Sequence, residues 1–469
     1  DVDIANLNLT EGGISFISHN LGKKMNVPKE VTRLGGIHYV GHLSGRGDRL
    51  SSKGRLETGA GNADIQLSKN GKNIQAKIAT KGIALDRILA NKTFGQVATT
   101  IEVKGNKDHL VAKGEISRFD YNKYSFRNIR LDGQYNHGIV KGLASIDDPN
   151  IRVDIEGNYA MKGNKYAINT HIDHLQPSIL GVKMADKGYS LDDIDLSANN
   201  QSSDSYLDLE APFMSLHARG QYNLSTLVSS IQNMIAEKLP TLPGIKKTKA
   251  KGDNDFTLQG NIYSTEVLNK ILGIPLAISS PIHINGNISE QSNELNLYLS
   301  APLFSYNGKP FHNGNVELTT LDNALSLEAR ITQGMPYEKA PEIKLKAAAA
   351  DNVLSTLLNY NNHSSKLPLS GLLNADTRFS KNEQGQLTIQ TSVKPSSLML
   401  GDTQWDVKAS TVEYHKNHLT VDNFVVKHDK QHVIINGMAT PNKEDSIVAD
   451  LKDVDVAYIL NLVNFHSVD

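Results

Sequence analysis

The sequence predicts an all-β protein, an elongated and repetitive antiparallel sheet curled into a U-shaped trough with a few short helices. Apolar and polar residues alternate along most of the 469 residues, so that each strand has one apolar and one polar face. Turn-forming pairs such as Asn70-Gly71 and Asn307-Gly308 separate the alternating stretches. This pattern is typical of an antiparallel sheet with one covered face, since parallel strands are apolar on both faces.

Helical patterns are short and evenly spaced. Apolar residues at positions i, i+3 and i+4, or a weaker version of that spacing, begin near Leu85, Leu175, Leu268, Leu354 and Val456. The mean interval between these starts is about 93 residues, and such regularity indicates a repeat architecture. We therefore expect residues 1–469 to form one continuous β-trough of stacked units, each beginning at a short helix.

An aromatic motif supports the repeat. The pattern F-x-Y-N-x-x-x-F-x-N runs from Phe119 to Asn128 and again from Phe304 to Asn313, 185 residues later. Trp405 falls at about the corresponding place in a further unit. We interpret these aromatic residues as turn and core residues of the repeat.

Residues 224–239 break the strand pattern. Their apolar side chains recur at helical spacing, and Pro240 and Pro243 predict the end of the helix. A lysine-rich loop follows up to residue 251. The segment 224–251 is interpreted as a helix with a basic loop, either a local insertion or a cap on the trough. The helix would pack over the sheet, or seat on an apolar surface or a membrane interface. We expect its apolar stripe, from Leu224 to Leu239, to be buried against apolar residues of the trough.

Composition and motifs favour a protein without catalysis. The 49 basic and 50 acidic side chains give a net charge of −1, which argues against nucleic acid held by bulk charge. No apolar run approaches the roughly 18–20 residues of a membrane span, and the absence of cysteine excludes thiolate chemistry. Nucleotide-binding, hydrolase and H-E-x-x-H motifs are missing. The acidic clusters Asp147-Asp148, Asp192-Asp193-Asp195 and Asp453-Asp455 are expected in turns or helix starts. We expect no catalytic residue, no metal and no cofactor.

The apolar face needs a cover, and the few helices are too short to supply one. Separate sandwiches of about 93 residues, a β-helix, or a trough whose inner face is covered by lipid would each solve this. Sparse large aromatics and the long period favour the trough. The predicted lipid-binding residues of the groove face are Leu295, Leu297, Leu299, Leu318, Leu325, Leu327, Ile331, Ile343, Leu345, Leu387, Ile389 and Val393.

Most of the chain resembles a middle segment of TamB-type proteins from Bacteroidetes-like bacteria, within the AsmA-like group of bridge-like lipid transfer proteins. The resemblance lies mainly in the stretches 400–407, 423–428 and 431–437, in Phe119–Asn128, and in the turn before Val153. It implies a β-taco fold and a periplasmic protein that carries phospholipid along an apolar groove. The chain begins at Asp1, so we expect a piece of a longer protein. An inner-membrane anchor and a domain that meets an Omp85-type outer-membrane partner would then lie outside it.

Three other functions remain open. The resemblance also implies a scaffold for outer-membrane protein assembly and secretion, which would hold nascent strands at the groove edges. A tandem β-sandwich adhesin would consist of separable units. A carbohydrate-active β-solenoid enzyme would place several carboxylates on one outward face.

Overall fold

The computed structural model is an all-β protein, as the alternation predicts. The structure describes residues 1–9, 29–201, 204–249, 252–337, 339–381, 383, 385–442 and 445–454. The chain forms two compact units. The first comprises Asp1–Ser202, Leu207–Pro212 and Lys270–Gly273, and the second comprises Ser203–Tyr206, Phe213–Asn269 and Ile274–Asp469.

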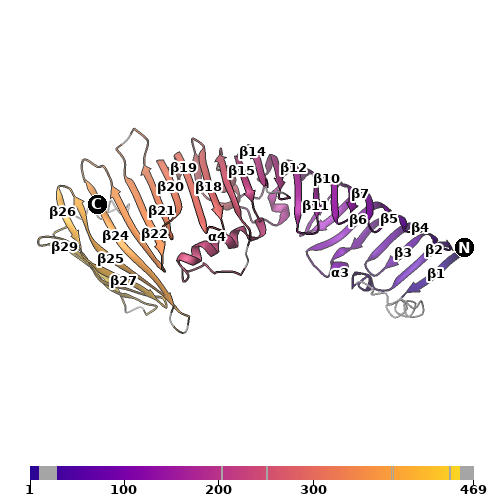
Figure 1. The fold of residues 1–469 in the computed structure, drawn as a ribbon. Coiled ribbons are helices and arrows are strands. Elements are labelled where there is room, and N and C mark those ends of the chain that lie inside the picture. The colour runs from indigo at the N-terminus through magenta and orange to yellow at the C-terminus, as the bar shows by residue number, and fades with distance from the viewer. Residues whose placement is uncertain are drawn as a thin grey trace. The chain divides into compact units, whose positions relative to one another are not determined.

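The first unit is an antiparallel meander (Figure 1). From β1 to β13 the strands pair in chain order, and β8 and β9 together flank β7. Its strands, with β14 starting one residue before the unit, are β1 (Val2–Leu9), β2 (Ile37–Arg46), β3 (Arg49–Thr58), β4 (Gly61–Asn70), β5 (Asn73–Ala84), β6 (Phe94–Gly105), β7 (His109–Tyr121), β8 (Tyr124–Phe126), β9 (Ile129–Asn136), β10 (Ile139–Asp148), β11 (Ile151–Ala160), β12 (Lys165–Leu175), β13 (Leu191–Asn199) and β14 (Tyr206–Ala211).

The second unit repeats this design. Antiparallel pairing runs from β15 to β30, with β17 and β18 together flanking β19, and β26 and β27 together flanking β25. Its strands are β15 (Met214–Gln221), β16 (Asp255–Ile262), β17 (Leu276–Ile278), β18 (Ile282–Ser289), β19 (Glu294–Tyr306), β20 (Lys309–Leu321), β21 (Ala324–Gln333), β22 (Glu342–Ala350), β23 (Val353–Asn361), β24 (Leu369–Lys381), β25 (Leu387–Leu400), β26 (Thr403–Val407), β27 (Ser410–His415), β28 (His418–His428), β29 (Gln431–Ala439) and β30 (Ile447–Lys452).

The helices match most of the predicted ones. The described helices are α2 (Lys29–Thr32), α3 (Leu85–Leu89), the 3₁₀-helix η1 (Pro177–Leu180), α4 (Leu224–Lys238) and α5 (Glu266–Leu272). Short helices thus occur at or near the predicted starts Leu85, Leu175 and Leu268. The start at Val456 lies outside the described residues. The predicted helix over residues 224–239 is confirmed as α4.

The helix predicted at Leu354 is wrong, because residues 353–361 form strand β23. Asp351 and Asn352 both have a positive φ and make a two-residue turn that joins β22 to β23. Such a turn directs the chain straight into a hairpin. The three leucines that suggested a helix lie on two faces of β23, and a period of 3.6 cannot be distinguished from a strand over so few residues.

The sheet continues through the predicted unit boundaries. Strand β5 pairs with β6 across α3, β12 pairs with β13 across η1, and β16 pairs with β18 across α5. Independent sandwiches of about 93 residues would break the pairing at these points. The pairing therefore argues against separate sandwiches at these places, while one continuous trough over the whole chain stays a prediction.

The repeated aromatic motif is a repeated hairpin. Asn122-Lys123 and Asn307-Gly308 are its turns, all four residues having a positive φ, and the phenylalanines on either side of each turn are cross-strand partners. The ring centroids are 6.2 Å apart for Phe119 and Phe126, and 5.5 Å apart for the later pair. The interpretation as turn and core residues is supported, and the motif fixes both turn and packing.

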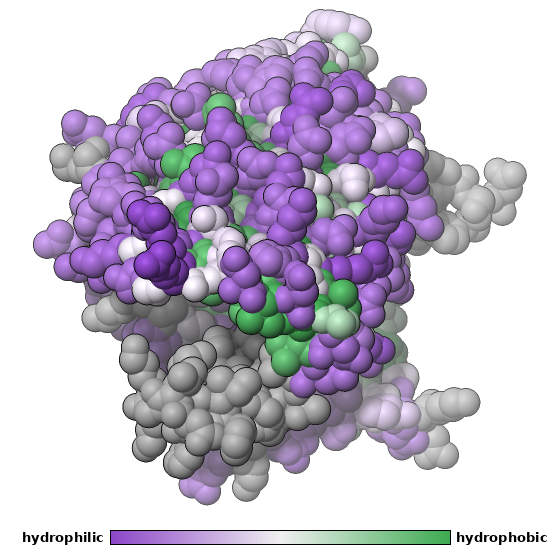
Figure 2. Space-filling model, turned by 90° about the vertical axis from the view of Figure 1, so that its right-hand side faces the viewer, coloured by the Kyte–Doolittle hydropathy of each residue, from purple (hydrophilic) through white to green (hydrophobic). Residues whose placement is uncertain are grey.

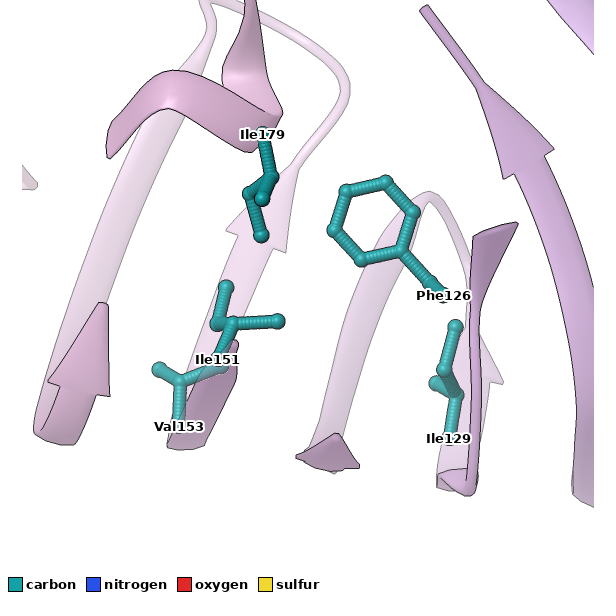
Figure 3. Packing of buried hydrophobic residues seen from close by; sticks show 5 residues of the cluster. All are labelled: Phe126, Ile129, Ile151, Val153 and Ile179. Atoms are coloured by element: carbon teal, nitrogen blue, oxygen red, sulfur yellow. The ribbon is translucent and has the colours of Figure 1, made fainter. Parts of the chain in front are cut away.

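Buried residues gather in clusters beside these hairpins. In the first unit Phe126, Ile129, Ile151, Val153 and Ile179 pack together, with Ile179 of η1 lying over the strands (Figure 3). In the second unit a corresponding cluster includes Trp405 and Val407. Trp405 pairs with Leu398 across the β25–β26 turn, as Phe126 pairs with Phe119 across its own.

Candidate functional site

The strongest candidate site is one face of the sheet from β19 to β25, in the second unit. Residues that are direct partners in adjacent strands lie on the same face of a sheet. One row of partners joins Leu297, Leu318, Leu327, Ala347, Thr356, Ala375 and Val393. Because side chains two residues apart share a face, this row places all twelve predicted groove residues together. We call this surface the apolar face.

The opposite face of the same strands is charged. Lys346 of β22 lies 2.7 Å from Glu328 of β21, and Lys394 of β25 lies 2.7 Å from Asp376 of β24. The Asp376 carboxyl accepts a hydrogen bond from Lys394, which is the main cause that lowers its pKa. The two faces thus differ sharply: ion pairs bridge the strands on one, and aliphatic side chains cover the other.

Exposure varies across the apolar face. A second row joins Leu299, Val316, Ala329, Leu345, Leu358 and Leu373, and every member is half-buried. We call it the Leu299 row. Towards the far end of the strands Ile343, partner of Ile331, is 40% exposed. The Leu299 row and Ile343 are therefore neither closed core nor isolated surface residues.

Two predicted groove residues belong to closed packing instead. Leu295 is only 6% exposed and Val393 only 8% exposed. Val393 packs with Trp405, Val407 and Val426 in a cluster that the sequence could not assign, because its members come from three separate strands. These two side chains are unsuited to contact a ligand on an open face.

Part of the cover on the apolar face comes from the segment after α4. Asn223 caps the helix by accepting a hydrogen bond from the Ser225 amide, and the chain leaves the helix before Pro240. Leu239 is 5% exposed and packs with Ala349 and Phe379. The half-buried residues around this cluster are Leu242, Leu325, Leu354 and Ile389. Two predicted groove residues, Leu325 and Ile389, therefore belong to the packing around Leu239, as the cross-strand partners of Ala349 and Phe379.

The helix itself presents its predicted apolar stripe differently from expectation. Met234 is buried, but Leu224 is 57% exposed and Val228 is 67% exposed. The N-terminal part of α4 instead turns Thr226 and Ser230 towards Asn254, a fully buried side chain that hydrogen-bonds to both. The expectation of a fully buried stripe is wrong for this part, because polar contacts set the rotation of the helix.

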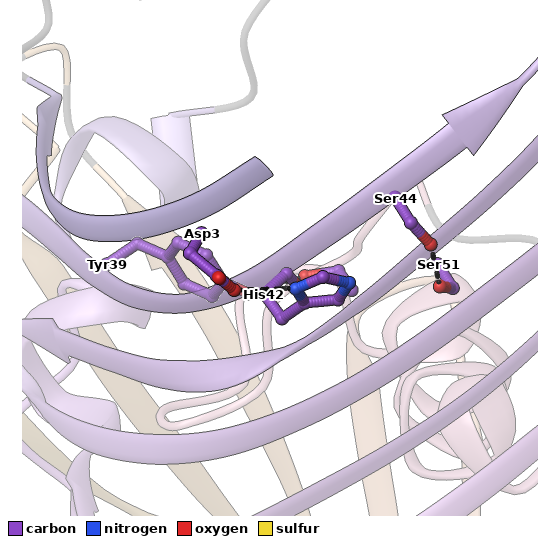
Figure 4. Close-up of polar contacts among 6 residues, drawn as sticks. Asp3, Tyr39, His42, Ser44 and Ser51 are labelled. Carbon is purple, nitrogen blue, oxygen red and sulfur yellow. Dashed lines mark hydrogen bonds and ion pairs between the residues drawn. The ribbon is translucent and has the colours of Figure 1, made fainter. Parts of the chain in front are cut away.

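The first unit carries polar contacts along its strands as well as aliphatic rows, such as Ile65, Ile78 and Ile101. The Asp3 carboxylate accepts a hydrogen bond from the His42 ring at 2.7 Å, and Ser44 and Ser51 form a cross-strand hydrogen bond (Figure 4). His171 lies 2.7 Å from Asp195, and this hydrogen bond is the main cause that raises the pKa of His171. The side of the molecule in Figure 2 is mostly hydrophilic, with hydrophobic residues in smaller patches.

The placement of the acidic clusters in turns or helix starts is wrong for two of them, because they lie in strands β10 and β13, where their residues serve the sheet. Asp192 and Asp195 both pair with histidines of the neighbouring strand β12. Asp148 is 2% exposed, and its carboxylate accepts hydrogen bonds from Tyr124 and from the Arg127 and Asn150 amides. Over the described ranges, no three histidine or acidic side chains are grouped as metal ligands, and no helix is long and apolar enough to cross a membrane.

The sequence matches no protein-family model and no curated protein. The sheet, its register and the packing on it are therefore the basis for a functional assignment.

Proposed function

We propose that the apolar face of β19–β25 binds the acyl chains of lipids and that the protein is a non-enzymatic lipid conduit. The observation that carries the proposal is the continuous Leu299 row, half-buried in every strand it crosses. Soluble proteins rarely leave a large contiguous apolar patch without a partner. Each CH₂ group that leaves water for such a surface contributes about 0.8 kcal/mol.

The uniformity of this face favours passage over specific capture. The Leu299 row is aliphatic throughout, and the row through Leu327 is aliphatic apart from Thr356, whereas a specific receptor combines an apolar pocket with a few placed polar groups. The proposal extends, on the resemblance to TamB-type proteins alone, to phospholipid transport through the periplasm between an inner-membrane anchor and an Omp85-type partner. No nucleic acid, metal or cofactor enters it.

The test is site-specific photo-crosslinking in cells. Photoreactive residues at positions 299 and 327 should capture lipid, detected by mass spectrometry, whereas position 298 on the polar face should capture little. Tyr298 is a suitable control because it is 45% exposed and neighbours Leu299 in the same strand. Lipid adducts at position 298 equal to those at 299 would contradict the proposal.

A charge on the apolar face should block the conduit. Leu297→Arg places a guanidinium among aliphatic rows, where the long side chain can lean towards water and leave the fold intact. We expect lipid capture at position 327 to fall severalfold, with an unchanged circular dichroism spectrum; Tyr298→Arg is the matched control. If Leu297→Arg unfolds the protein, the apolar face is a closed, dry core, and the proposal of a lipid-binding groove is contradicted.

One observation favours the second candidate, a scaffold for outer-membrane protein assembly. Among the described residues β30 pairs only with β29, and all six of its residues are exposed, including Val448 and Leu451. An exposed strand edge can accept a further strand from another protein. A photoreactive residue at position 448 that captures protein, while position 299 captures no lipid, would favour the scaffold over the conduit.

A further inference from the structure

The segment from α4 to Leu242 is tied to one end of the second unit's sheet by contacts with three successive hairpin turns. Asn293, Asn323 and Asn352 lie in the turns β18–β19, β20–β21 and β22–β23, and each has a positive φ. Figure 1 shows α4 running alongside these strands. We call residues 224–242 the strap.

The strap meets each turn through polar groups. Glu237 accepts a hydrogen bond from Asn293 at 2.9 Å, and Lys238 donates one to Asn323 at 2.6 Å. The side chain of Asn352 donates a hydrogen bond to the Thr241 hydroxyl at 2.8 Å, and the backbone N–H of Asn352 donates one to the Lys238 carbonyl at 2.9 Å. Each contact has an equivalent in water, so its single net contribution to docking is modest.

Lys238 makes the docked position costly. Its side chain is 6% exposed, and its partners are the neutral amide of Asn323 and, at 3.6 Å, the carboxylate of Glu237. A charged amine held out of water with this limited pairing loses hydration that it regains when released. The polar contacts therefore position the strap more than they hold it.

Met234 and Ala236 are buried on α4, and the residues after the helix add apolar packing on the proposed ligand surface. Leu239 packs with Ala349 and Phe379, whose cross-strand partners are Leu325 and Ile389, and Leu242 packs against the same cluster. An aliphatic side chain and an acyl chain are equivalent occupants of such a surface, because both gain by leaving water. The strap and a lipid therefore compete for the turn-side edge of the apolar face.

We propose that the strap is an internal occupant of the apolar face, displaced when an acyl chain binds at its turn-side edge. This inference rests on the proposed function and adds that the apolar face has two parts, one permanently open and one covered by the strap. The Leu299 row is open to ligand at all times, and the edge at Leu325 and Ile389 opens only when Leu239 and Leu242 leave. The strap thereby sets the width of the surface offered to lipid.

The experiment compares photo-capture of fluorescent palmitate at positions 389 and 299 in the full chain. With the native strap we expect capture at 299 and little at 389. Leu239→Ser removes most of the apolar burial of one leucine, so the equilibrium between docked and released strap should shift towards the released form on the order of tenfold. Capture should therefore rise at position 389 and stay unchanged at position 299. Leu224→Ser on the exposed side of the same helix is the matched control.

A disulfide tests the opposite direction. The chain has no cysteine, so Thr241→Cys with Asn352→Cys creates a single pair at a place where the native side chains already touch. Oxidation should abolish capture at 389 even in the Leu239→Ser background, and reduction should restore it. If capture at position 389 does not change between the oxidised and the reduced pair, the proposal that the strap covers this edge is contradicted.

The outcomes separate the two proposals. No capture at either position contradicts the lipid conduit itself. Capture at 299 with no response at 389 to Leu239→Ser contradicts the strap alone. Hydrogen exchange gives an independent measure: amides of residues 239–242 should exchange faster than those of β22 and β23, and equally slow exchange would mean a fixed wall.

Discussion

At the scale of single residues, ion pairs on the polar face have a pH dependence whose sign is fixed. The pKa of Asp376 is lowered, chiefly by the hydrogen bond from Lys394. A carboxyl with a lowered folded pKa stabilises the protein above its unfolded pKa of about 3.9, and this contribution disappears as the pH falls through the lower folded value. The pair is partly exposed, so we expect at most about 1 kcal/mol.

Asp376→Asn should therefore lower the free energy of unfolding by up to about 1 kcal/mol at neutral pH and make no difference at pH values below the folded pKa. Urea unfolding at a series of pH values measures this. Asp402→Asn, in the exposed β25–β26 turn, is the control. A difference that persists unchanged in acid would show that Asp376 acts through packing and not through its charge.

Residue patterns predicted which face each side chain takes but not how deeply it is buried. All twelve predicted groove residues share a face, because the side-chain period of a strand is two and register transmits it between strands. The burial of Val393 depends on Trp405 and Val426, which join it only in the fold. Likewise, no local sequence pattern predicts that Leu239 packs with Ala349 and Phe379.

At the scale of elements, the hairpin turns decide the structure where patterns are ambiguous. Asp351-Asn352 resembles a helix start in sequence, since both residue types cap helices, yet it closes a hairpin. The α4 helix was predicted because its apolar spacing continues over many residues, whereas the three leucines from Leu354 were too few. The rotation of α4 about its axis was not predicted, because it depends on the hydrogen bond between Ser230 and Asn254, a residue beyond the helix in the chain.

The two copies of the aromatic hairpin make a matched pair for a stability test. Lys123 has φ 71° where the later copy has Gly308 at φ 74°. The left-handed region costs a residue with a Cβ about 1–2 kcal/mol, part of which glycine returns through its freer unfolded chain. Lys123→Gly should raise the free energy of unfolding by about 0.5–1 kcal/mol.

The reverse change, Gly308→Lys, should lower the free energy of unfolding by a similar amount. Denaturant unfolding of both variants, with hydrogen exchange of the flanking strand amides, locates the effect. If Lys123→Gly does not stabilise the protein and Gly308→Lys does not destabilise it, the left-handed backbone of these turns is not strained.

At the scale of the whole molecule, strand pairing across the short helices distinguishes a continuous sheet from separable domains within each unit. The β5–β6 pairing extends from Ile74 with Gly105 to Ala84 with Gln96, although α3 lies between the two strands in sequence. A chain cut between α3 and β6 would therefore still be joined by the ladder of backbone hydrogen bonds and by the side chains on both faces. Two independent sandwiches that met at α3 would share no such ladder.

A protease site inserted between Asn91 and Lys92, both exposed, makes this a direct experiment. After complete cleavage, seen on a denaturing gel, we expect the two fragments to elute together in size-exclusion chromatography and to separate only in denaturant, because closing a paired strand buries apolar surface as well as backbone polar groups. The same insertion in the Asn70-Gly71 turn, inside a predicted unit, is the control and should behave alike. Fragments that part in buffer after cleavage at residue 91, but not after cleavage at residue 70, would place a domain boundary at α3 and restore the tandem sandwich.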